Sequence, residues 1–181
     1  MSNNVYNFGA GPATLPSSVI EQVKSNLQDF DNGMSIMEIS HRSSAFKDYA
    51  DQSEASIRKL LNISDDYAVL FLQGGATFQF SMVPQNLSEW LPNKKYQING
   101  SANYLITGGW SNKAADYAKF HTSVNTVYDS SENSYTSVTD IKDWNINPDV
   151  DYFYYCANET VHGLEIHETP DISGPIICDM S

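Results

Sequence analysis

Residues 68–77 read AVLFLQGGAT, a short apolar run that ends in two glycines. The pattern predicts a strand at residues 68–72, a glycine turn, and a helix over residues 78–91. Glycine lets the backbone turn sharply and approach a ligand without a Cβ in the way. The unpaired N–H groups at a helix start, with the positive end of its dipole, favour anions. The unit therefore predicts a phosphate-bearing ligand, or else a tight turn that only leads into a packed helix.

Motifs and charge exclude several common classes of protein. The glycine turn is followed by no Gly-Lys-Ser/Thr and lacks the Gly-x-Gly-x-x-Gly spacing of dinucleotide-binding folds. No Gly-x-Ser-x-Gly elbow supports a serine hydrolase. The histidines His121, His162 and His167 lack metal-ligand spacing, so we expect no metal. The formal net charge of −12 argues against nucleic acid or an anionic membrane as a partner.

The composition is that expected of a cytoplasmic globular protein. A chain of 181 residues with 41% hydrophobic and 18% charged residues can form one substantial core. Cys156 and Cys178 lie in apolar runs, and we expect both to be reduced. No apolar run approaches the length of about 18 residues that a membrane span needs. The first residues contain neither the basic region nor the apolar segment of a secretory signal.

Two helices are predicted in the first third of the chain. Turn-forming residues from Asn7 to Pro16 predict an N-terminal arm. Ser17 is expected to cap a helix that runs through Phe30, and a second helix is predicted over residues 45–62. The apolar face of the first is Val19, Ile20, Val23 and Leu27, and the buried stripe of the second is Phe46, Tyr49, Ser53, Ile57, Leu60 and Leu61.

Strands and helices then alternate along the chain. This alternation predicts an α/β fold with a mainly parallel sheet and helices on both faces. In such sheets, ligands bind at the carboxyl ends of the strands. Beyond the glycine turn, strands are predicted at residues 103–107, 121–128, 152–156 and 175–179, with a helix through residues 114–117. Polar or glycine residues at four strand ends are Gly74-Gly75, Gly108-Gly109-Trp110, Asn158-Glu159-Thr160 and Asp179.

Four side chains are suited to ligand chemistry, although each has a simpler explanation. Trp110 follows two glycines, so it could stack on a flat heteroaromatic ring or fill a hydrophobic gap. Asp179 could hold a proton on a heterocyclic nitrogen or cap the next helix. Arg42 could hold a carboxylate or phosphate through two hydrogen bonds, with His41 as a further donor. For a single arginine in an acidic chain, an exposed salt bridge is the default interpretation.

Six motifs follow one another in an order and spacing that can be compared with known families. They are Asn7-Phe8-x-x-Gly11-Pro12-x-x-Leu15-Pro16, Glu38-Ile39-Ser40-His41-Arg42-Ser43, Gln73-Gly74-Gly75-Ala76-Thr77-x-Gln79-Phe80, Gly109-Trp110-Ser111, Cys156-x-Asn158-Glu159-Thr160-x-His162-Gly163 and Asp179-Met180-Ser181. Together they resemble the phosphoserine aminotransferase family, pyridoxal 5′-phosphate enzymes of the class-V aminotransferase group. The resemblance covers essentially the whole chain.

The resemblance implies cofactor-binding roles for five residues. Ala76 and Thr77 match the positions that bind the phosphate of pyridoxal 5′-phosphate. Trp110 matches the aromatic residue that stacks on the pyridine ring, and Thr160 the hydroxyl that bonds the phenolic oxygen of the ring. Asp179 matches the carboxylate that pairs with the protonated pyridine nitrogen, which makes the ring an electron sink.

The resemblance also implies substrates and partners. His41 and Arg42 match the site that receives the carboxylate of glutamate and the phosphate of phosphoserine. The implied reaction interconverts glutamate and 3-phosphooxypyruvate with 2-oxoglutarate and phosphoserine. It belongs to serine biosynthesis, with pyridoxine biosynthesis as a second pathway to consider. A cytoplasmic homodimer is implied.

The resemblance is to the amino-terminal half of the family. The lysine that forms the Schiff base with the cofactor lies beyond position 181 in this family, so no catalytic residue is assigned here. We expect residues 1–16 to form an arm and residues 17–181 an incomplete large domain of the aspartate-aminotransferase-like fold. The C-terminal small domain is expected to be absent.

Two other functions are left open by the sequence. The chain could be a catalytically inactive fragment or a phosphate-binding module without transaminase activity. It could also be another class-V pyridoxal 5′-phosphate enzyme, such as a cysteine desulfurase. The latter is disfavoured because that group has a histidine where Trp110 stands and needs a mobile cysteine, which we do not find here.

Overall fold

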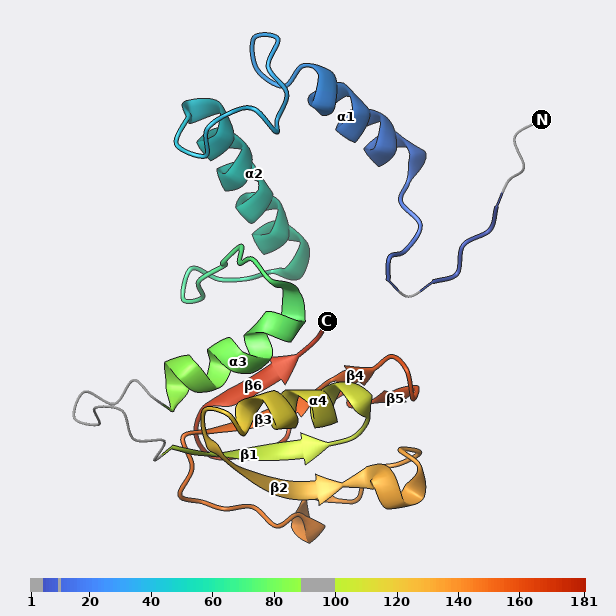
Figure 1. Cartoon of the computed structure of the whole chain (residues 1–181), viewed down its shortest axis with the longest axis vertical. Helices are drawn as coiled ribbons and strands as arrows, with labels where there is room; N and C mark the ends of the chain where they lie inside the picture. Colours follow the sequence, from blue (N-terminus) through green and yellow to red (C-terminus); the bar gives the residue numbers. More distant parts are fainter. Residues whose placement is uncertain (1–4, 10, 89–99) are drawn as a thin grey trace. The chain divides into compact units, whose positions relative to one another are not determined.

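The computed structural model describes residues 5–9, 11–88 and 100–181. The chain forms two compact units, Met1–Phe71 and Leu72–Ser181 (Figure 1).

The first unit contains two helices, α1 (Ser17–Gln28) and α2 (Ser44–Leu61). Both helices were predicted from their sequence periodicity. Pro16 rather than Ser17 is the N-cap of α1, and residues 5–9 and 11–16 before it have no regular secondary structure. The N-cap of α2 is Ser43, whose hydroxyl accepts a hydrogen bond from the N–H of Phe46.

The stripe that was predicted to be buried on α2 is not buried, since the helix contains no buried residue. Leu60 and Leu61 are 82% and 70% exposed. The described part of this unit contains two helices and offers no second layer large enough to bury such a stripe. The apolar residues of α1 are also between 40% and 51% exposed.

The strand predicted at residues 68–72 is wrong, because this segment has no regular secondary structure. Leu70, Phe71 and Leu72 are 70%, 61% and 57% exposed. A strand exists only when a neighbour accepts and donates its ladder hydrogen bonds, and no described strand pairs with this segment. An apolar run without a pairing partner therefore stays extended and exposed.

The second unit is built on a four-stranded sheet of β1 (Ser101–Ile106), β2 (Ser123–Asp129), β3 (Tyr152–Cys156) and β6 (Ile176–Asp179). The strand order is β2-β1-β3-β6, and all three pairs are parallel (Figure 1). The mainly parallel sheet and its four predicted strands are thus confirmed. All five residues of β3 are buried, as expected for a central parallel strand.

One face of the sheet is covered by two helices, α3 (Gly75–Leu87) and α4 (Gly109–Ala118). Phe80 of α3 and the small residues Ala114 and Ala118 of α4 pack there against Tyr104 and Tyr154. Helix α3 begins at Gly75, three residues earlier than predicted. Gly74 is its N-cap, and Gly75 is the first residue of the helix. The predicted end of this helix, residues 89–91, lies outside the described residues.

The other face of the sheet carries a second apolar cluster around Leu105, Phe153 and Tyr155. Within this unit it is covered by side chains from the irregular segments before β3 and before β6, such as Trp144 and Ile172. The segment before β3 contains two 3-10 helices, Ser130–Asn133 and Ile141–Asp143. A short antiparallel pair, β4 (Asn158–Glu159) and β5 (Leu164–Glu165), follows β3 and was not predicted.

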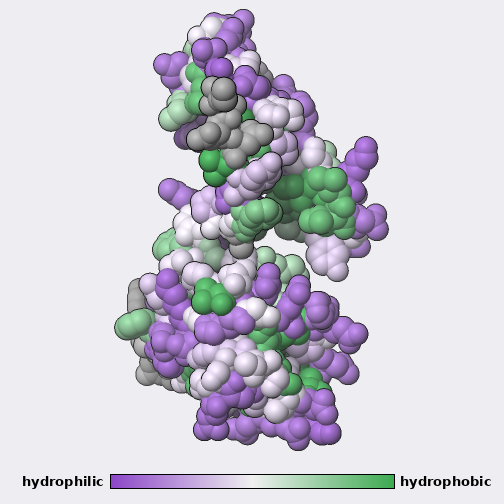
Figure 2. Space-filling model, turned by 90° about the vertical axis from the view of Figure 1, so that its right-hand side faces the viewer, coloured by the Kyte–Doolittle hydropathy of each residue, from purple (hydrophilic) through white to green (hydrophobic). Residues whose placement is uncertain are grey.

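Within the described residues, no helix is long and apolar enough to cross a membrane. The face of the molecule drawn in Figure 2 carries mainly hydrophilic residues, interrupted by separate hydrophobic patches.

Candidate functional site

The glycine turn leads into a helix start with free hydrogen-bond donors. Gly74 has φ = 98°, and a Cβ at this position would lie 2.5 Å from the Cβ of Phe78, so both the backbone angle and the space require glycine. No described residue accepts a hydrogen bond from the N–H groups of Gly75, Ala76 or Thr77. The first turn of α3 also contains no acidic residue. These donors are available to an anion, as the sequence indicated.

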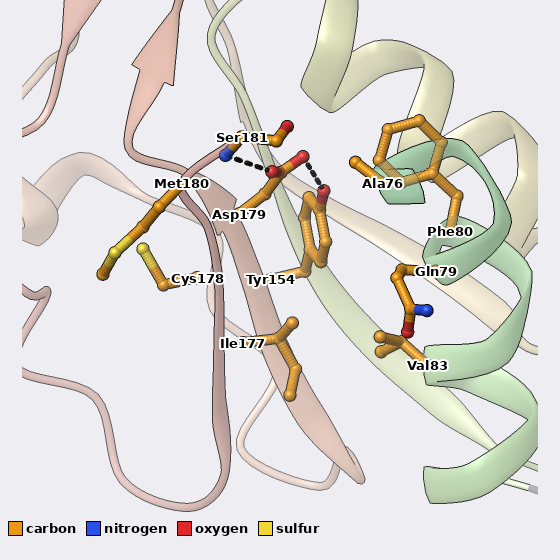
Figure 3. A pocket seen from close by; sticks show the side chains of 10 residues that line it. All are labelled: Ala76, Gln79, Phe80, Val83, Tyr154, Ile177, Cys178, Asp179, Met180 and Ser181. Atoms are coloured by element: carbon orange, nitrogen blue, oxygen red, sulfur yellow. Dashed lines mark hydrogen bonds between the residues drawn. The ribbon is translucent and has the colours of Figure 1, made fainter. Parts of the chain in front are cut away.

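Asp179 ends β6 and is held in place by two hydrogen bonds. Its Oδ2 accepts from the hydroxyl of Tyr154 at 3.0 Å, and its Oδ1 accepts from the N–H of Ser181 at 3.0 Å (Figure 3). Burial raises the pKa of the Tyr154 hydroxyl above its usual value, and the nearby Asp179 carboxylate raises it further. Tyr154 therefore stays a neutral donor that orients the carboxylate. Nothing in the sequence pattern indicated this role for Tyr154.

A cavity of about 380 Å³ lies between the start of α3 and the end of β6. This volume falls in the range of small-molecule sites. Ala76 and Phe80 line it from α3, and Tyr154 and Asp179 line it from the sheet, so residues about a hundred positions apart face one space (Figure 3). The remaining lining residues are Gln79, Val83, Ile177, Cys178, Met180 and Ser181.

Trp110 and Thr160 follow the carboxyl ends of the neighbouring strands β1 and β3. The indole Nε1–H of Trp110 donates to the hydroxyl oxygen of Thr160 at 2.9 Å. The ammonium of Lys113 lies 5.7 Å from the indole ring centroid, within the range of a cation–π contact. Trp110 is 37% exposed, so it is not a hydrophobic plug and part of its surface is accessible to a ligand.

Glu159 is a further residue of this edge whose role the sequence did not indicate. Its side chain is fully buried. It accepts hydrogen bonds from the N–H of Trp110 at 2.9 Å, from the N–H of Ser111 at 2.8 Å and from the Ser111 hydroxyl. The carboxylate thus lies at the N-terminus of α4, where the helix dipole favours negative charge. The feature of the sequence that could have pointed to Glu159 was its place in the motif Asn158-Glu159-Thr160.

The fit between Glu159 and α4 leaves no room for a side chain at Gly108. A Cβ there would lie 2.5 Å from the carboxyl carbon of Glu159. Gly108→Ala is therefore expected to lower the free energy of unfolding by about 1–3 kcal/mol, the usual cost of overpacking a buried site. Chemical denaturation measures this change. Gly109→Ala is the control, since its Cβ would lie 3.4 Å from His162 in ordinary contact; equal stability losses in both variants would contradict the account.

His41 and Arg42 belong to the first unit, in the turn before α2. Both side chains are exposed, and neither makes a hydrogen bond or ion pair with another described residue. The turn itself is fixed, because the N–H and the hydroxyl of Ser43 both donate to the carbonyl of Ser40. The substrate-binding role of His41 and Arg42 stays a prediction.

The two cysteines are free thiols. Cys156 is buried in β3, and burial raises its pKa to about 12, so it is not a reactive nucleophile. Cys178 is half-buried in β6. Neither lies on a loop that could carry a mobile catalytic cysteine.

Residues 5–176 match the pattern of the family described as Aminotransferase class-V. The chain belongs to this family. It is similar to the phosphoserine aminotransferase of Nitrosomonas europaea, at 44% identity over 98% of this chain and 48% of the relative. The resemblance to phosphoserine aminotransferases stated from the motifs is confirmed.

Solved structures of phosphoserine aminotransferases have the same fold. One, concerned with radiation damage of the Schiff base, has a TM-score of 0.87 and 37% identity, over 98% of this chain and 48% of that one. Another, from Trichomonas vaginalis with pyridoxal 5′-phosphate bound, has a TM-score of 0.85 and 34% identity, over 98% of this chain and 51% of that one. The chain spans about half the length of the curated relatives it matches.

The residues of the second unit fit pyridoxal 5′-phosphate. The free N–H groups at the start of α3 suit a phosphate, and the oriented carboxylate of Asp179 suits a protonated ring nitrogen. The accessible indole of Trp110 suits the face of an aromatic ring. A phosphate site and a carboxylate that share one cavity are the combination this cofactor needs.

Proposed function

We propose that this chain is the cofactor-binding part of a phosphoserine aminotransferase. The enzyme would transfer the amino group between glutamate and 3-phosphooxypyruvate, giving 2-oxoglutarate and phosphoserine. The observation that carries the proposal is the cavity that Ala76 and Asp179 share at the carboxyl edge of the sheet. Relatives named phosphoserine aminotransferase support the choice of substrates.

Five residues of the second unit would hold the cofactor, and a sixth would orient one of them. When bound, pyridoxal 5′-phosphate supplies an electron sink for the negative charge that develops at the substrate Cα. The N–H groups of Ala76 and Thr77, with the Thr77 hydroxyl, bind its phosphate. Trp110 covers one face of its ring, and Thr160 donates to its phenolic oxygen. Asp179 keeps the ring nitrogen protonated, with Tyr154 orienting the carboxylate.

His41 and Arg42 bind the distal anion of the substrate. Arginine presents two parallel N–H groups, which match a carboxylate or a phosphate. One anion pocket would then serve glutamate and phosphoserine in turn, which fits a ping-pong transamination. Serine biosynthesis, a role in pyridoxine biosynthesis, a cytoplasmic location and a homodimer belong to the same proposal and rest on the family resemblance alone.

The polypeptide of residues 1–181 is expected to have no transaminase activity. Proton transfer at the substrate Cα needs a positioned base, and the family uses the Schiff-base lysine. Borohydride reduction in the presence of the cofactor, followed by peptide mapping, tests this. We expect no stoichiometric adduct on any lysine of this polypeptide, Lys113 beside Trp110 included. The full-length protein is expected to form glutamate from phosphoserine and 2-oxoglutarate.

Three outcomes would contradict these expectations. A single stoichiometric adduct on one lysine of residues 1–181 would mean that this chain carries its own Schiff-base residue. A full-length protein that binds the cofactor but does not react with phosphoserine would point to another class-V enzyme. A full-length protein that binds inorganic phosphate but not pyridoxal 5′-phosphate would favour the phosphate-binding module.

A further inference from the structure

Glu159 is a buried acidic side chain. Its exposed fraction is 0%, and it forms no ion pair with a described residue. A buried charge is costly unless hydrogen bonds replace its water. Here the two N–H donors and the hydroxyl at the start of α4 replace it. The hydrogen bonds that stabilise this buried carboxylate therefore come from the first residues of α4.

The hydrogen bonds of Glu159 act on the backbone that carries Trp110. The N-cap of α4 is Gly108, which has no side chain, so the cap comes from Glu159, which lies 49 positions after Trp110 in the chain. Helix caps ordinarily come from the N-cap residue itself. A cap supplied from beyond β3 couples the end of that strand to the start of α4. It fixes the helix start against a neighbouring strand end.

The position of Glu159 is itself fixed by its own backbone. It pairs with Leu164 in the antiparallel ladder of β4 and β5. Its carbonyl accepts hydrogen bonds from the N–H groups of His162 at 3.1 Å and Gly163 at 2.7 Å. The next residue, Thr160, accepts from the Trp110 indole. Trp110 is therefore held at its main chain by Glu159 and at its ring by Thr160.

We propose that Glu159 is a positioning residue that sets the orientation of the Trp110 indole and thereby the affinity for the cofactor ring. The inference rests on the proposed function, because it assigns Trp110 to the face of pyridoxal 5′-phosphate. In this role Glu159 touches neither the cofactor nor the substrate and acts through the backbone of α4.

Glu159→Gln in the full-length protein tests the proposal by cofactor binding. Glutamine keeps the shape, but its amide N–H₂ faces an N–H donor at Trp110 or Ser111. The dissociation constant for pyridoxal 5′-phosphate, measured by equilibrium dialysis, is expected to rise at least about tenfold, since a donor left unpaired in a buried site is expensive. Glu168→Gln, the same change at an exposed residue, is expected to leave it unaltered.

A double-mutant cycle separates positioning from a general structural effect. Trp110→Ala removes the ring that Glu159 is proposed to orient. If Glu159 acts through this ring, Glu159→Gln adds less than about twofold to the loss in the Trp110→Ala background. Losses that multiply in the double variant would overturn the proposal. So would a dissociation constant for Glu159→Gln within about twofold of the Glu168→Gln control.

A second readout uses the protein without cofactor and so does not depend on the proposed function. With 5-fluorotryptophan incorporated, the fluorine signal of Trp110 is identified by its absence in Trp110→Ala. We expect this signal to shift or broaden in Glu159→Gln and to stay unchanged in Glu168→Gln. An unchanged signal would overturn the positioning role. If the parent protein does not bind the cofactor, the proposed function fails, and the fluorine signal still decides the positioning role.

A conservative variant covers the case in which Glu159→Gln does not fold. Glu159→Asp keeps the charge but is one methylene shorter, so it cannot reach both N–H groups of α4. We expect a folded protein in which the Trp110 signal moves in the same direction and cofactor binding weakens less than in Glu159→Gln. Parent-like binding and an unmoved signal in Glu159→Asp would contradict the proposal.

Discussion

Asp179→Asn is expected to lower the turnover number of the full-length protein on the order of a hundredfold or more, with pyridoxal 5′-phosphate still bound. Asparagine keeps the shape of the side chain and loses the charge that would hold the ring nitrogen protonated. A loss of ionic stabilisation of a few kcal/mol corresponds to a rate change of roughly this size. The measurement is the rate of glutamate formation from phosphoserine and 2-oxoglutarate, with cofactor content followed by absorbance.

Asp171→Asn is the matched control for this variant. Asp171 is exposed in the segment before β6, so the substitution removes one negative charge away from the cavity. Its turnover number is expected to equal that of the parent. If Asp179→Asn stayed within a factor of about three of the parent, the role of Asp179 at the ring nitrogen would be wrong.

Arg42→Ala is expected to lower kcat/KM for phosphoserine and for glutamate together, by roughly a hundredfold. One pocket receives both substrates in the proposal, so one substitution removes the charge-assisted partner of both. Cofactor absorbance is expected to be unchanged, because the cofactor phosphate is assigned to the donors at Ala76 and Thr77 and not to Arg42. Steady-state kinetics with each acidic substrate measure the effect.

Three comparisons make the Arg42 result specific. Arg42→Lys is expected to recover only part of the loss, because ammonium keeps the charge but not the planar fork. Lys47→Ala removes an exposed positive charge in the first turn of α2 and is expected to have no effect. Alanine, which has no distal anion, is expected to react equally poorly with parent and variant. Reduced cofactor occupancy with unaltered KM for both acidic substrates would show that Arg42 is structural or faces the cofactor.

The parts of the fold that follow from local pattern were predicted well. The four strands of the sheet are uninterrupted apolar or mixed runs between turn residues, and all lie where the sequence indicated. The segment at residues 68–72 has the same local pattern and is not a strand. A strand needs a hydrogen-bonding neighbour, and local sequence does not report whether one is present.

Candidate site residues could be selected from the sequence, but the contacts of their side chains could not be predicted from it. Ala76 and Asp179 were both selected from the sequence, and they line one cavity. Tyr154 and Glu159 were missed as supporting residues. Their partners, Asp179 and Trp110, lie 25 and 49 positions away, so only the folded chain brings them together. The motif Asn158-Glu159-Thr160 marked the position of Glu159 but did not indicate that its carboxylate caps a remote helix.

The most direct test of the account is a crystal structure of the full-length protein with pyridoxal 5′-phosphate. We expect the phosphate to lie against the N–H groups of Ala76 and Thr77, and the pyridine nitrogen to lie within hydrogen-bond distance of the Asp179 carboxylate. The Trp110 indole is expected to lie parallel to the ring. A cofactor bound elsewhere, or bound here with its ring nitrogen away from Asp179, would contradict the central claim that the carboxyl edge of this sheet is a pyridoxal 5′-phosphate site.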